Sequence, residues 1–354
     1  MRSGLTLCVL AVFLSNNLIA QGNTHISAEG IQVEYLDQDS IFFRSATVDF
    51  VRIRSTKTEN VQIAIVVFKP AKPSPVLLLS HGWHGSVSKP KPNADNPHSQ
   101  FLTIEVDMRG RTYSTGKQDC NGYELYDFYD AYRYALVHYR DLISDPDQVY
   151  LRGESGGGGN GFGLVGKFPD LFCSAVINCG PSDYELWYRC DSVGEFRDEM
   201  VPWIGVTPDE NPEAYASRSG ITTVANVLTP SYVCHGELDK RVPAEHSRRY
   251  YDIAKRMNKP VRYLELKGVG DERHWGNITD EQNTQKHQFE QEALARHEVP
   301  VLPLSGRLFV AGFLVTKTFL VFMNSVDDIG IIDYDLGRHR VEFVIGEGVV
   351  EWAR

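Results

Sequence analysis

Positive charge is scarce in this sequence of 354 residues: 36 Lys and Arg stand against 46 Asp and Glu, which gives a formal net charge of −10 at pH 7. Because nucleic acids and anionic membrane surfaces select basic proteins, this balance argues against both as partners. The chain also has no heptad run, low-complexity tract or internal repeat. Its composition, 42% hydrophobic and 23% charged, is typical of a soluble globular protein.

Cysteine is scarce too. One of the six, Cys8, lies in an N-terminal apolar run, and the others are Cys120, Cys173, Cys179, Cys190 and Cys234. None forms a C-x-x-C pair and no Cys/His cluster has the spacing of zinc ligands, so we predict no metal and no cofactor. Five is an odd number, so at least one thiol stays unpaired unless it bridges two chains. Cys179 with Cys190 is the nearest pairing between loops.

Long hydrophobic runs are missing as well, because the run Leu5–Leu14 is too short to span a membrane. Arg2 precedes this run and the small Ala20 follows it, a pattern typical of a secretory signal peptide over residues 1–20. A buried N-terminal strand is the alternative. Leu7 before Cys8 does not suit a lipoprotein site. We therefore predict a secreted or periplasmic protein, in a compartment where disulfides persist.

Short apolar strands alternate with helical segments from residue 61 to residue 297. The strands include "SPVLLLSHG", "FLTIEVDMRG", "QVYLRG", "CSAVINCG", "PSYVCHGELD" and "PVRYLELKG", and the helices include Tyr123–Leu142, 244–258 and 282–297. This alternation predicts an α/β fold, with a mostly parallel central sheet and helices on both faces. We expect a signal peptide at 1–20, a catalytic domain at 21–299 with a loop-rich insertion at 181–229, and a small C-terminal β appendage at 300–354.

A glycine-rich loop, "YLRGESGGGGNGFGLVGKF", allows three interpretations. Its glycines match the G-x-G-x-x-G pattern of dinucleotide-binding proteins, with Asp183 as the acidic residue downstream, and 161–167 match most of a phosphate-binding loop. Gly153, Ser155 and Gly157 match the G-x-S-x-G turn of serine hydrolases. Several strands precede the loop, which does not suit the first pattern, and Phe168 replaces the magnesium-binding Ser or Thr of the second.

The serine hydrolase pattern makes further demands that the sequence meets. Its serine stands on a tight turn from a strand to a helix, and an acid and a histidine should follow later strands in that order. Ser155 is the candidate nucleophile, Asp239 follows the strand "YVCHG", and His274 lies in the loop after "VRYLELKG". Each alone has a structural alternative: a close helix-to-strand contact, a turn former before Pro243, and a surface histidine. Their conjunction favours a catalytic triad.

An oxyanion hole should accompany the triad, because negative charge develops on the carbonyl oxygen in the transition state. One donor should be the backbone N–H after the nucleophile, Gly156, and the other should come from the loop after an earlier strand. That loop is "SHGWHGS", and the N–H of Trp83 is our candidate. We assign structural roles to Asp183, His235 and His246.

Two segments carry a family resemblance. "DPDQVYLRGESGGGGNGFGLVGKFPDLFCSAVINCGPSDYELW" and "YVCHGELDKRVPAEHSRRYYDIAKRMNKPVRYLELKG" resemble the catalytic domain of the prolyl oligopeptidase family, and "DMRGRTYSTG" is similar to a loop of acyl and acetyl esterases. The resemblance covers roughly residues 61–291. It implies the α/β-hydrolase fold, serine hydrolase activity without a cofactor, and Ser155, Asp239 and His274 as the triad.

Two departures from the family bear on the substrate. About forty residues precede the hydrolase sheet after the signal peptide, where family peptidases often carry a β-propeller, and Arg273 rather than Gly precedes His274. With Trp83, we place Glu154 and Trp275 at the substrate mouth. The expected substrate is a small peptide or a carboxylic ester, including an acyl group on an extracellular polymer. A non-catalytic binding protein on the same fold is the alternative of another class.

Overall fold

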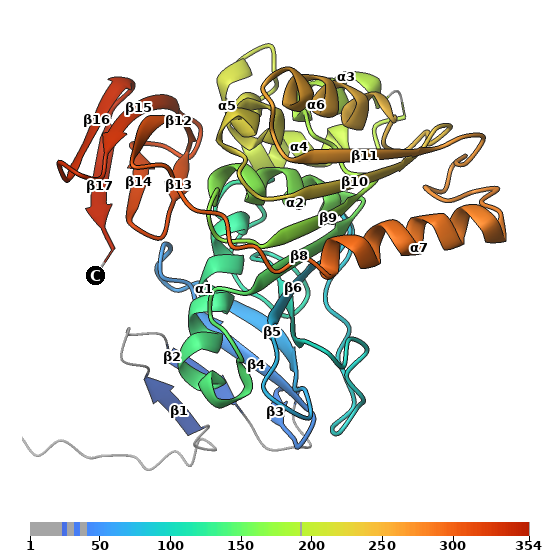
Figure 1. Cartoon of the computed structure of the whole chain (residues 1–354), viewed down its shortest axis with the longest axis vertical. Coiled ribbons are helices and arrows are strands. Elements are labelled where there is room, and N and C mark those ends of the chain that lie inside the picture. The colour runs from blue at the N-terminus through green and yellow to red at the C-terminus, as the bar shows by residue number, and fades with distance from the viewer. Residues whose placement is uncertain (1–22, 27–31, 36–40, 192, 354) are drawn as a thin grey trace, which may run out of the picture.

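The computed structural model describes residues 23–26, 32–35, 41–191 and 193–353, so the predicted signal peptide lies outside the described residues. Within these ranges the chain forms a sheet of eleven strands and, after it, a second sheet of six strands (Figure 1). In this part of the chain, no helix has the length and the apolar character needed to cross a bilayer.

The larger sheet is parallel in the half that carries the site. Its order is β1-β2-β4-β5-β7-β6-β8-β9-β10-β11, with β3 paired to β4, and all neighbours from β7 to β11 are parallel. The strands are β1 (Asn23–Ile26), β2 (Gln32–Tyr35), β3 (Phe43–Arg44), β4 (Val48–Arg54), β5 (Gln62–Phe68), β6 (Val76–Ser80), β7 (Leu102–Asp107), β8 (Val149–Glu154), β9 (Ser174–Asn178), β10 (Ser231–Gly236) and β11 (Val261–Leu266). The predicted α/β class is confirmed.

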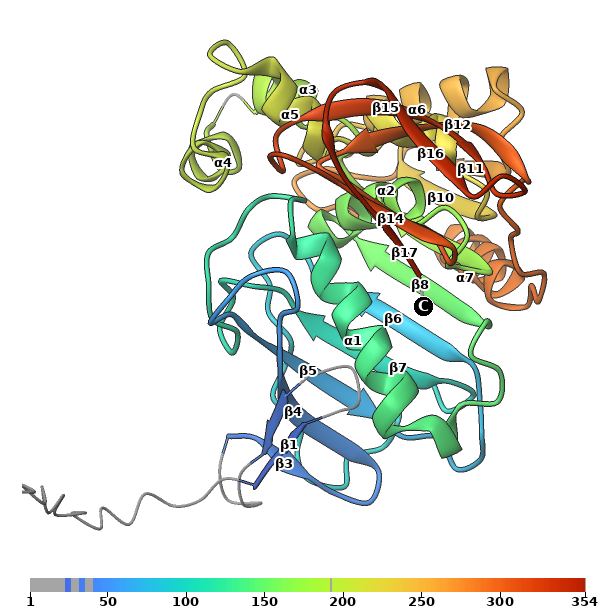
Figure 2. The ribbon, with the colours of Figure 1, turned by 90° about the vertical axis from the view of Figure 1, so that its left-hand side faces the viewer.

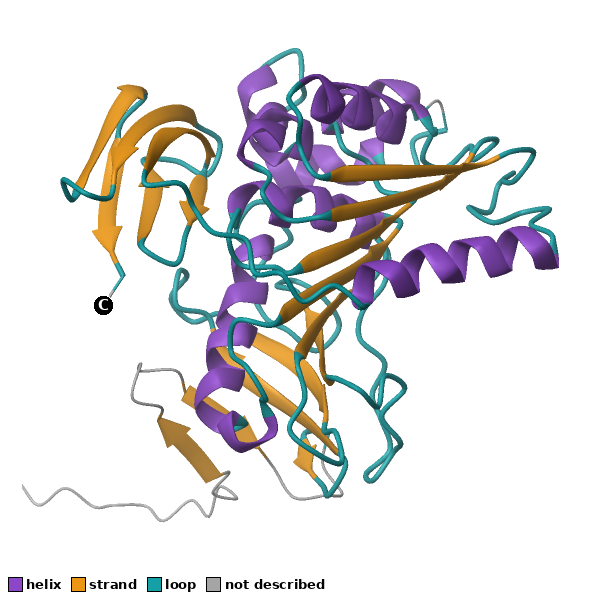
Figure 3. Cartoon of the chain, viewed as in Figure 1, coloured by secondary structure: helices purple, strands orange, loops and turns teal. Residues whose placement is uncertain are grey.

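Helices cover both faces of this sheet, which explains why its central strands are apolar on both sides. In Figures 1 and 3, α1 and α2 lie on one side of the strands and α7 lies on the other. On the first side Leu78 and Leu151 belong to the main core, whereas Leu77 and Tyr150 pack on the α7 side. The helices are α1 (Glu124–His138), α2 (Gly156–Lys167), α6 (Glu245–Arg256) and α7 (Asp280–Leu294), with a 3-10 turn η1 (Arg140–Leu142) after α1.

The insertion at 181–229 is helical, so our expectation of a loop-rich segment was wrong. It contains α3 (Tyr184–Cys190), α4 (Arg197–Ile204), α5 (Pro212–Arg218) and the 3-10 helix η2 (Gly220–Asn226). These helices have seven or eight residues, too few to display a helical period in the sequence. Side-chain caps were the available signal: Asp183 accepts the N–H of Leu186, and Asn211 accepts the N–H of Ala214.

The C-terminal segment forms an antiparallel sheet in the order β16-β15-β12-β13-β14-β17. Its strands are β12 (Ser305–Ala311), β13 (Phe313–Val315), β14 (Phe319–Met323), β15 (Ile329–Asp335), β16 (Arg340–Ile345) and β17 (Gly348–Trp352). The two outer strands are joined by 346–347 alone, which span about 11 Å, whereas a flat sheet of this size would separate them by about 24 Å. The sheet must therefore curl.

This second sheet packs against the outer side of α1 and α2, away from the carboxyl ends of the parallel strands (Figures 1 and 2). Phe313 contacts the ends of both helices, since its ring centroid lies 5.9 Å from that of Tyr123 and 5.8 Å from that of Phe168. The buried Lys167, the lysine of the phosphate-loop pattern, donates to the carbonyl oxygens of Ser217 and Ala311 at the same junction. That lysine therefore lies at the C-terminal end of α2, where it ties the second sheet to the first domain.

Candidate active site

The turn between β8 and α2 places Ser155 at the carboxyl edge of the sheet. Ser155 has φ 60° and ψ −125°, a conformation that costs energy for a residue with a side chain and that is typical of the nucleophile turn of serine hydrolases. The two flanking glycines are required by close packing. A Cβ on Gly153 would lie 2.1 Å from the carbonyl oxygen of Gly157, and a Cβ on Gly157 would lie 2.7 Å from that of Ser80.

The structure brings Ser155, His274 and Asp239 together from three separate loops. His274 Nε2 lies 2.8 Å from Ser155 Oγ, and His274 Nδ1 lies 2.6 Å from Asp239 Oδ2. The carboxylate can only accept, so Nδ1 carries the hydrogen and Nε2 is free to accept from the serine hydroxyl. The side chain of His274 is 11% exposed and that of Asp239 is fully buried. The histidine therefore contacts solvent, whereas the acid is shielded from it.

Asp239 is held as a carboxylate by its surroundings. Burial favours the neutral acid, but the hydrogen bond from His274 and the nearby ring of His235, whose Nε2 lies 3.5 Å from Oδ2, outweigh it. The pKa of Asp239 therefore lies well below its usual range. Its other oxygen, Oδ1, accepts the backbone N–H groups of Arg241 at 3.0 Å and Val242 at 3.1 Å. The acid therefore has a fixed orientation and a fixed charge, the two properties that keep a partner histidine in one tautomer.

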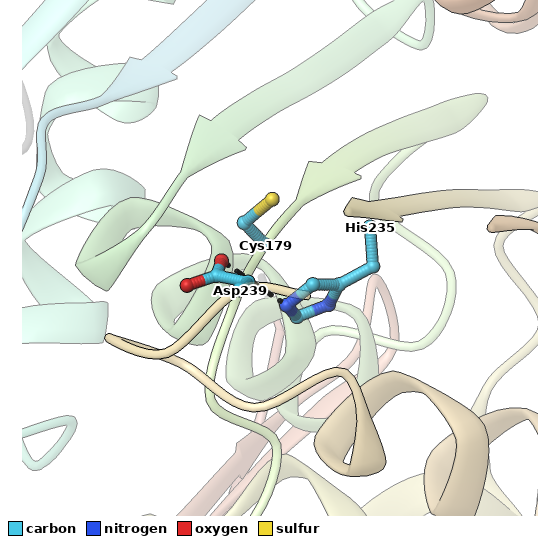
Figure 4. A group of neighbouring side chains, drawn as sticks. All are labelled: Cys179, His235 and Asp239. Carbon is cyan, nitrogen blue, oxygen red and sulfur yellow. Dashed lines mark ion pairs between the residues drawn. The ribbon is translucent and has the colours of Figure 1, made fainter. Parts of the chain in front are cut away.

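Cys179 and His235 lie beside this acid (Figure 4). Their ligand atoms and those of Asp239 all lie within 4.8 Å of one another, which is close enough for the three side chains to hold one metal ion. Both nitrogens of His235 already have partners, Ser247 Oγ at 2.7 Å and the carbonyl of Val242 at 2.8 Å. Burial raises the pKa of the Cys179 thiol well above its usual range. The histidine nitrogens therefore already have other partners, and the cysteine keeps its proton. The three residues suit a role in holding Asp239 better than a role in binding a metal.

The loop after β6 lies directly against the nucleophile turn. A Cβ on Gly156 would lie 2.4 Å from the backbone N of Trp83, and a Cβ on Gly82 would lie 3.9 Å from Ser155 Cβ. The two N–H groups expected to form an oxyanion hole, those of Gly156 and Trp83, are therefore neighbours beside Ser155. Only glycine at position 156 permits this approach.

An aromatic cluster from the insertion covers Trp83, and the sequence did not lead us to it. Trp83 is 6% exposed, and its ring centroid lies 4.6 Å from that of Trp203, 4.8 Å from that of Trp187 and 6.2 Å from that of Phe196. The guanidinium of Arg111 lies 4.9 Å above Trp203. Three of the five tryptophans of the chain meet here, but their distance in sequence gives no local pattern.

Glu154 and Trp275, the two residues expected at the substrate mouth, lie in different surroundings from each other. Glu154 lines a cavity of about 210 Å³ with His81, Arg152 and Glu105, beneath the loop after β6. Trp275 packs with Phe289 of α7 and neighbouring apolar residues, and Lys286 lies 4.8 Å from its ring centroid. Trp275 is thus engaged in packing on the α7 side of the sheet.

Asp183 and His246 have structural surroundings. Asp183 caps α3 and pairs with Arg249 at 3.1 Å. His246 is fully buried next to His235, and burial lowers its pKa to about 3. The pairing of Cys179 with Cys190 does not form: the cysteines of the described residues are free, Cys179 buried and Cys190 exposed.

Comparison with known proteins assigns the family. The model of the prolyl oligopeptidase family matches residues 99–297. An uncharacterized peptidase, YtmA of Bacillus subtilis, is 29% identical over 46% of this chain and 61% of its own length, and the acylamino-acid-releasing enzyme of Sus scrofa is 27% identical over 34% of this chain and 17% of its own. The chain thus spans less than two thirds of the length of these curated relatives.

Solved structures share the fold. The acylaminoacyl peptidase of Pyrococcus horikoshii superposes with a TM-score of 0.58 and 20% identity, over 72% of this chain and 43% of that one. Puromycin hydrolase gives 0.55 and 16%, over 80% and 40%. The match of the family model to more than half of the chain, together with these relatives, shows that the chain belongs to the prolyl oligopeptidase family and is a serine hydrolase.

Proposed function

We propose that this chain hydrolyses a peptide or acyl-aminoacyl bond of a small substrate through an acyl-enzyme, with Ser155 as the nucleophile. The observation that carries the proposal is the pair of contacts made by His274, 2.8 Å to Ser155 and 2.6 Å to Asp239. A serine hydroxyl is a weak nucleophile unless an oriented base accepts its proton. This arrangement supplies the base and its orientation.

The reaction follows from the positions of these groups. His274 Nε2 takes the proton of Ser155 as Oγ attacks the substrate carbonyl, and the N–H groups of Gly156 and Trp83 stabilise the negative charge on the carbonyl oxygen. Asp239 stabilises the imidazolium that forms. His274 then gives the proton to the leaving group, and water attacks the acyl-enzyme in the same way to release the acid.

Relatives suggest the substrate class. Proteins named acylamino-acid-releasing enzyme and puromycin hydrolase share sequence or fold with this chain, and the first name describes the release of an acylated amino acid. A carboxylic ester is the second candidate. The loop 107–116 is similar to one of acyl and acetyl esterases, and the fold match to a Pyrococcus furiosus esterase extends over 92% of that enzyme, with a TM-score of 0.50 and 13% identity.

A fluorophosphonate probe tests the site. We expect the wild-type chain to form a covalent adduct that Ser155→Ala abolishes, with Ser99→Ala, outside the site, as the matched control. The absence of an adduct on folded wild type would favour a binding protein, and an adduct on Ser155→Ala would refute the nucleophile. Acyl-aminoacyl amides compared with carboxylic esters of the same acyl group then give the substrate class through kcat/KM.

We also propose that the chain is exported. The support is the sequence Arg2, the apolar run Leu5–Leu14 and the small Ala20. Expression in a secreting host should give a mature protein whose N-terminal residue is Gln21. Retention of Met1 on the exported protein would contradict the cleavage site.

A further inference from the structure

The side chain of Trp83 is held by a carboxylate of the insertion. Trp83 Nε1 donates to Glu199 Oε2 at 2.5 Å, a hydrogen bond between α4 and the loop after β6. A hydrogen bond to an ionised acceptor is about twice as strong as one between neutral groups. Because Trp83 also packs against the aromatic cluster of the insertion, its ring has little freedom to turn.

Glu199 contacts the next residue of the loop as well. His84 Nε2 lies 3.1 Å from Glu199 Oε2, so one carboxylate engages two consecutive side chains. The neighbouring carboxylate on the insertion, Glu195, is 3.8 Å from His84 and pairs with Arg241. Glu199 is thus the acid of α4 that engages Trp83, and its side chain is 37% exposed.

We propose that Glu199 is a positioning residue for the oxyanion hole. By holding the Trp83 ring, Glu199 keeps the backbone N–H of Trp83 beside the backbone N–H of Gly156, the two groups assigned to the oxygen that becomes negative. Such donors act because they are oriented before the reaction, and a displacement of about 1 Å can cost about 10² in rate. The inference rests on the proposed function. It implies that the reaction depends on the packing of α4 against the loop after β6.

Single substitutions give the first test. Glu199→Ala should lower kcat by about 10- to 100-fold with KM changed by less than about threefold, because the donor remains but is no longer held. Glu199→Gln keeps an oxygen that accepts from Trp83 Nε1 and should recover most of kcat. Asp198→Ala is the matched control, since Asp198 lies on the same helix with a 70% exposed side chain and pairs with Arg197. It should match wild type.

A double-mutant cycle identifies the route of the effect. Trp83→Phe keeps an aromatic ring and removes the Nε1–H, so Glu199→Ala should then add less than about twofold. The effect should persist in His84→Gln. Three outcomes would each overturn the proposal. Glu199→Ala could lower kcat as much in the Trp83→Phe background as in wild type, it could have no effect in the His84→Gln background, or the single variant Glu199→Ala could have the kcat of wild type.

Affinity for a peptide boronic acid supplies a readout that a loss of folding would not mimic. The tetrahedral boronate places an oxygen in the oxyanion hole, so Glu199→Ala should weaken it in proportion to kcat, while the product acid binds unchanged. Equal weakening of both would show a general structural role. Fluorophosphonate labelling of wild type reports separately on the proposed function: if labelling fails, both ideas fall, and if labelling succeeds while Glu199→Ala matches wild type, only the positioning role falls.

Discussion

Exchange of Asp239 for asparagine gives a sharp test of the proposed triad, because the structure dictates how the amide must sit. Oδ1 of Asp239 accepts two backbone N–H groups, at 3.0 and 3.1 Å. In the Asp239→Asn variant the amide oxygen must keep that place, since an NH₂ group there would face two donors. The NH₂ group is then directed at His274 Nδ1, which can only accept from it, and the histidine hydrogen moves to Nε2.

This tautomer faces Ser155 with an N–H and cannot accept the serine proton. In serine hydrolases the same exchange lowers kcat by about 10⁴, which corresponds to about 5 kcal/mol of transition-state stabilisation. The backbone hydrogen bonds of the acid loop survive, so we expect the midpoint of thermal unfolding to change by less than about 5 °C. The loss should therefore be chemical rather than structural.

The assay is kcat on the best substrate of the amide and ester panel, with the rate of fluorophosphonate labelling as a second measure. Asp333→Asn, an exposed acid of the second sheet paired with Arg307, is the control and should match wild type. A kcat of Asp239→Asn within about tenfold of wild type, in a protein with unchanged unfolding, would refute both the role of the acid and the tautomer argument.

Two further predictions follow from the packing. Gly156→Ala places a methyl group 2.4 Å from the backbone nitrogen of Trp83, so one oxyanion donor must move and kcat should fall by about 10²–10³. Gly161→Ala is the control, because the nearest atom to its methyl group would be in the Ile177 side chain, at 3.1 Å. Equal kcat values for the two variants would contradict this prediction. Burial holds the pKa of His246 at about 3, so the unfolded chain binds the extra proton between about pH 6.5 and pH 3 and stability falls as the pH is lowered through this window. His246→Leu should weaken that dependence in urea unfolding at about pH 7, 6 and 5, and an unchanged slope would count against it.

Much of the fold was readable because its signals are local. A strand buried on both faces is a continuous apolar run, and the nucleophile turn needs small residues at fixed positions around Ser155. The order of strands and helices in the larger domain follows from such patterns. The helices of the insertion could not be predicted in this way, because they are too short to show a helical period in the sequence. Their capping residues, Asp183 and Asn211, were the local signal for them.

The sequence by itself determined which residues could act, since Ser155, Asp239 and His274 each follow a strand in the order that the chemistry needs. Only the tertiary structure decided that they meet, because the parallel order β8-β9-β10-β11 brings the carboxyl ends of distant strands to one edge. It also placed Glu199 on Trp83 and left Cys179 and Cys190 unbonded. Contacts of this kind join residues far apart in the chain, so they depend on how the helices and loops pack and leave no trace in a local pattern.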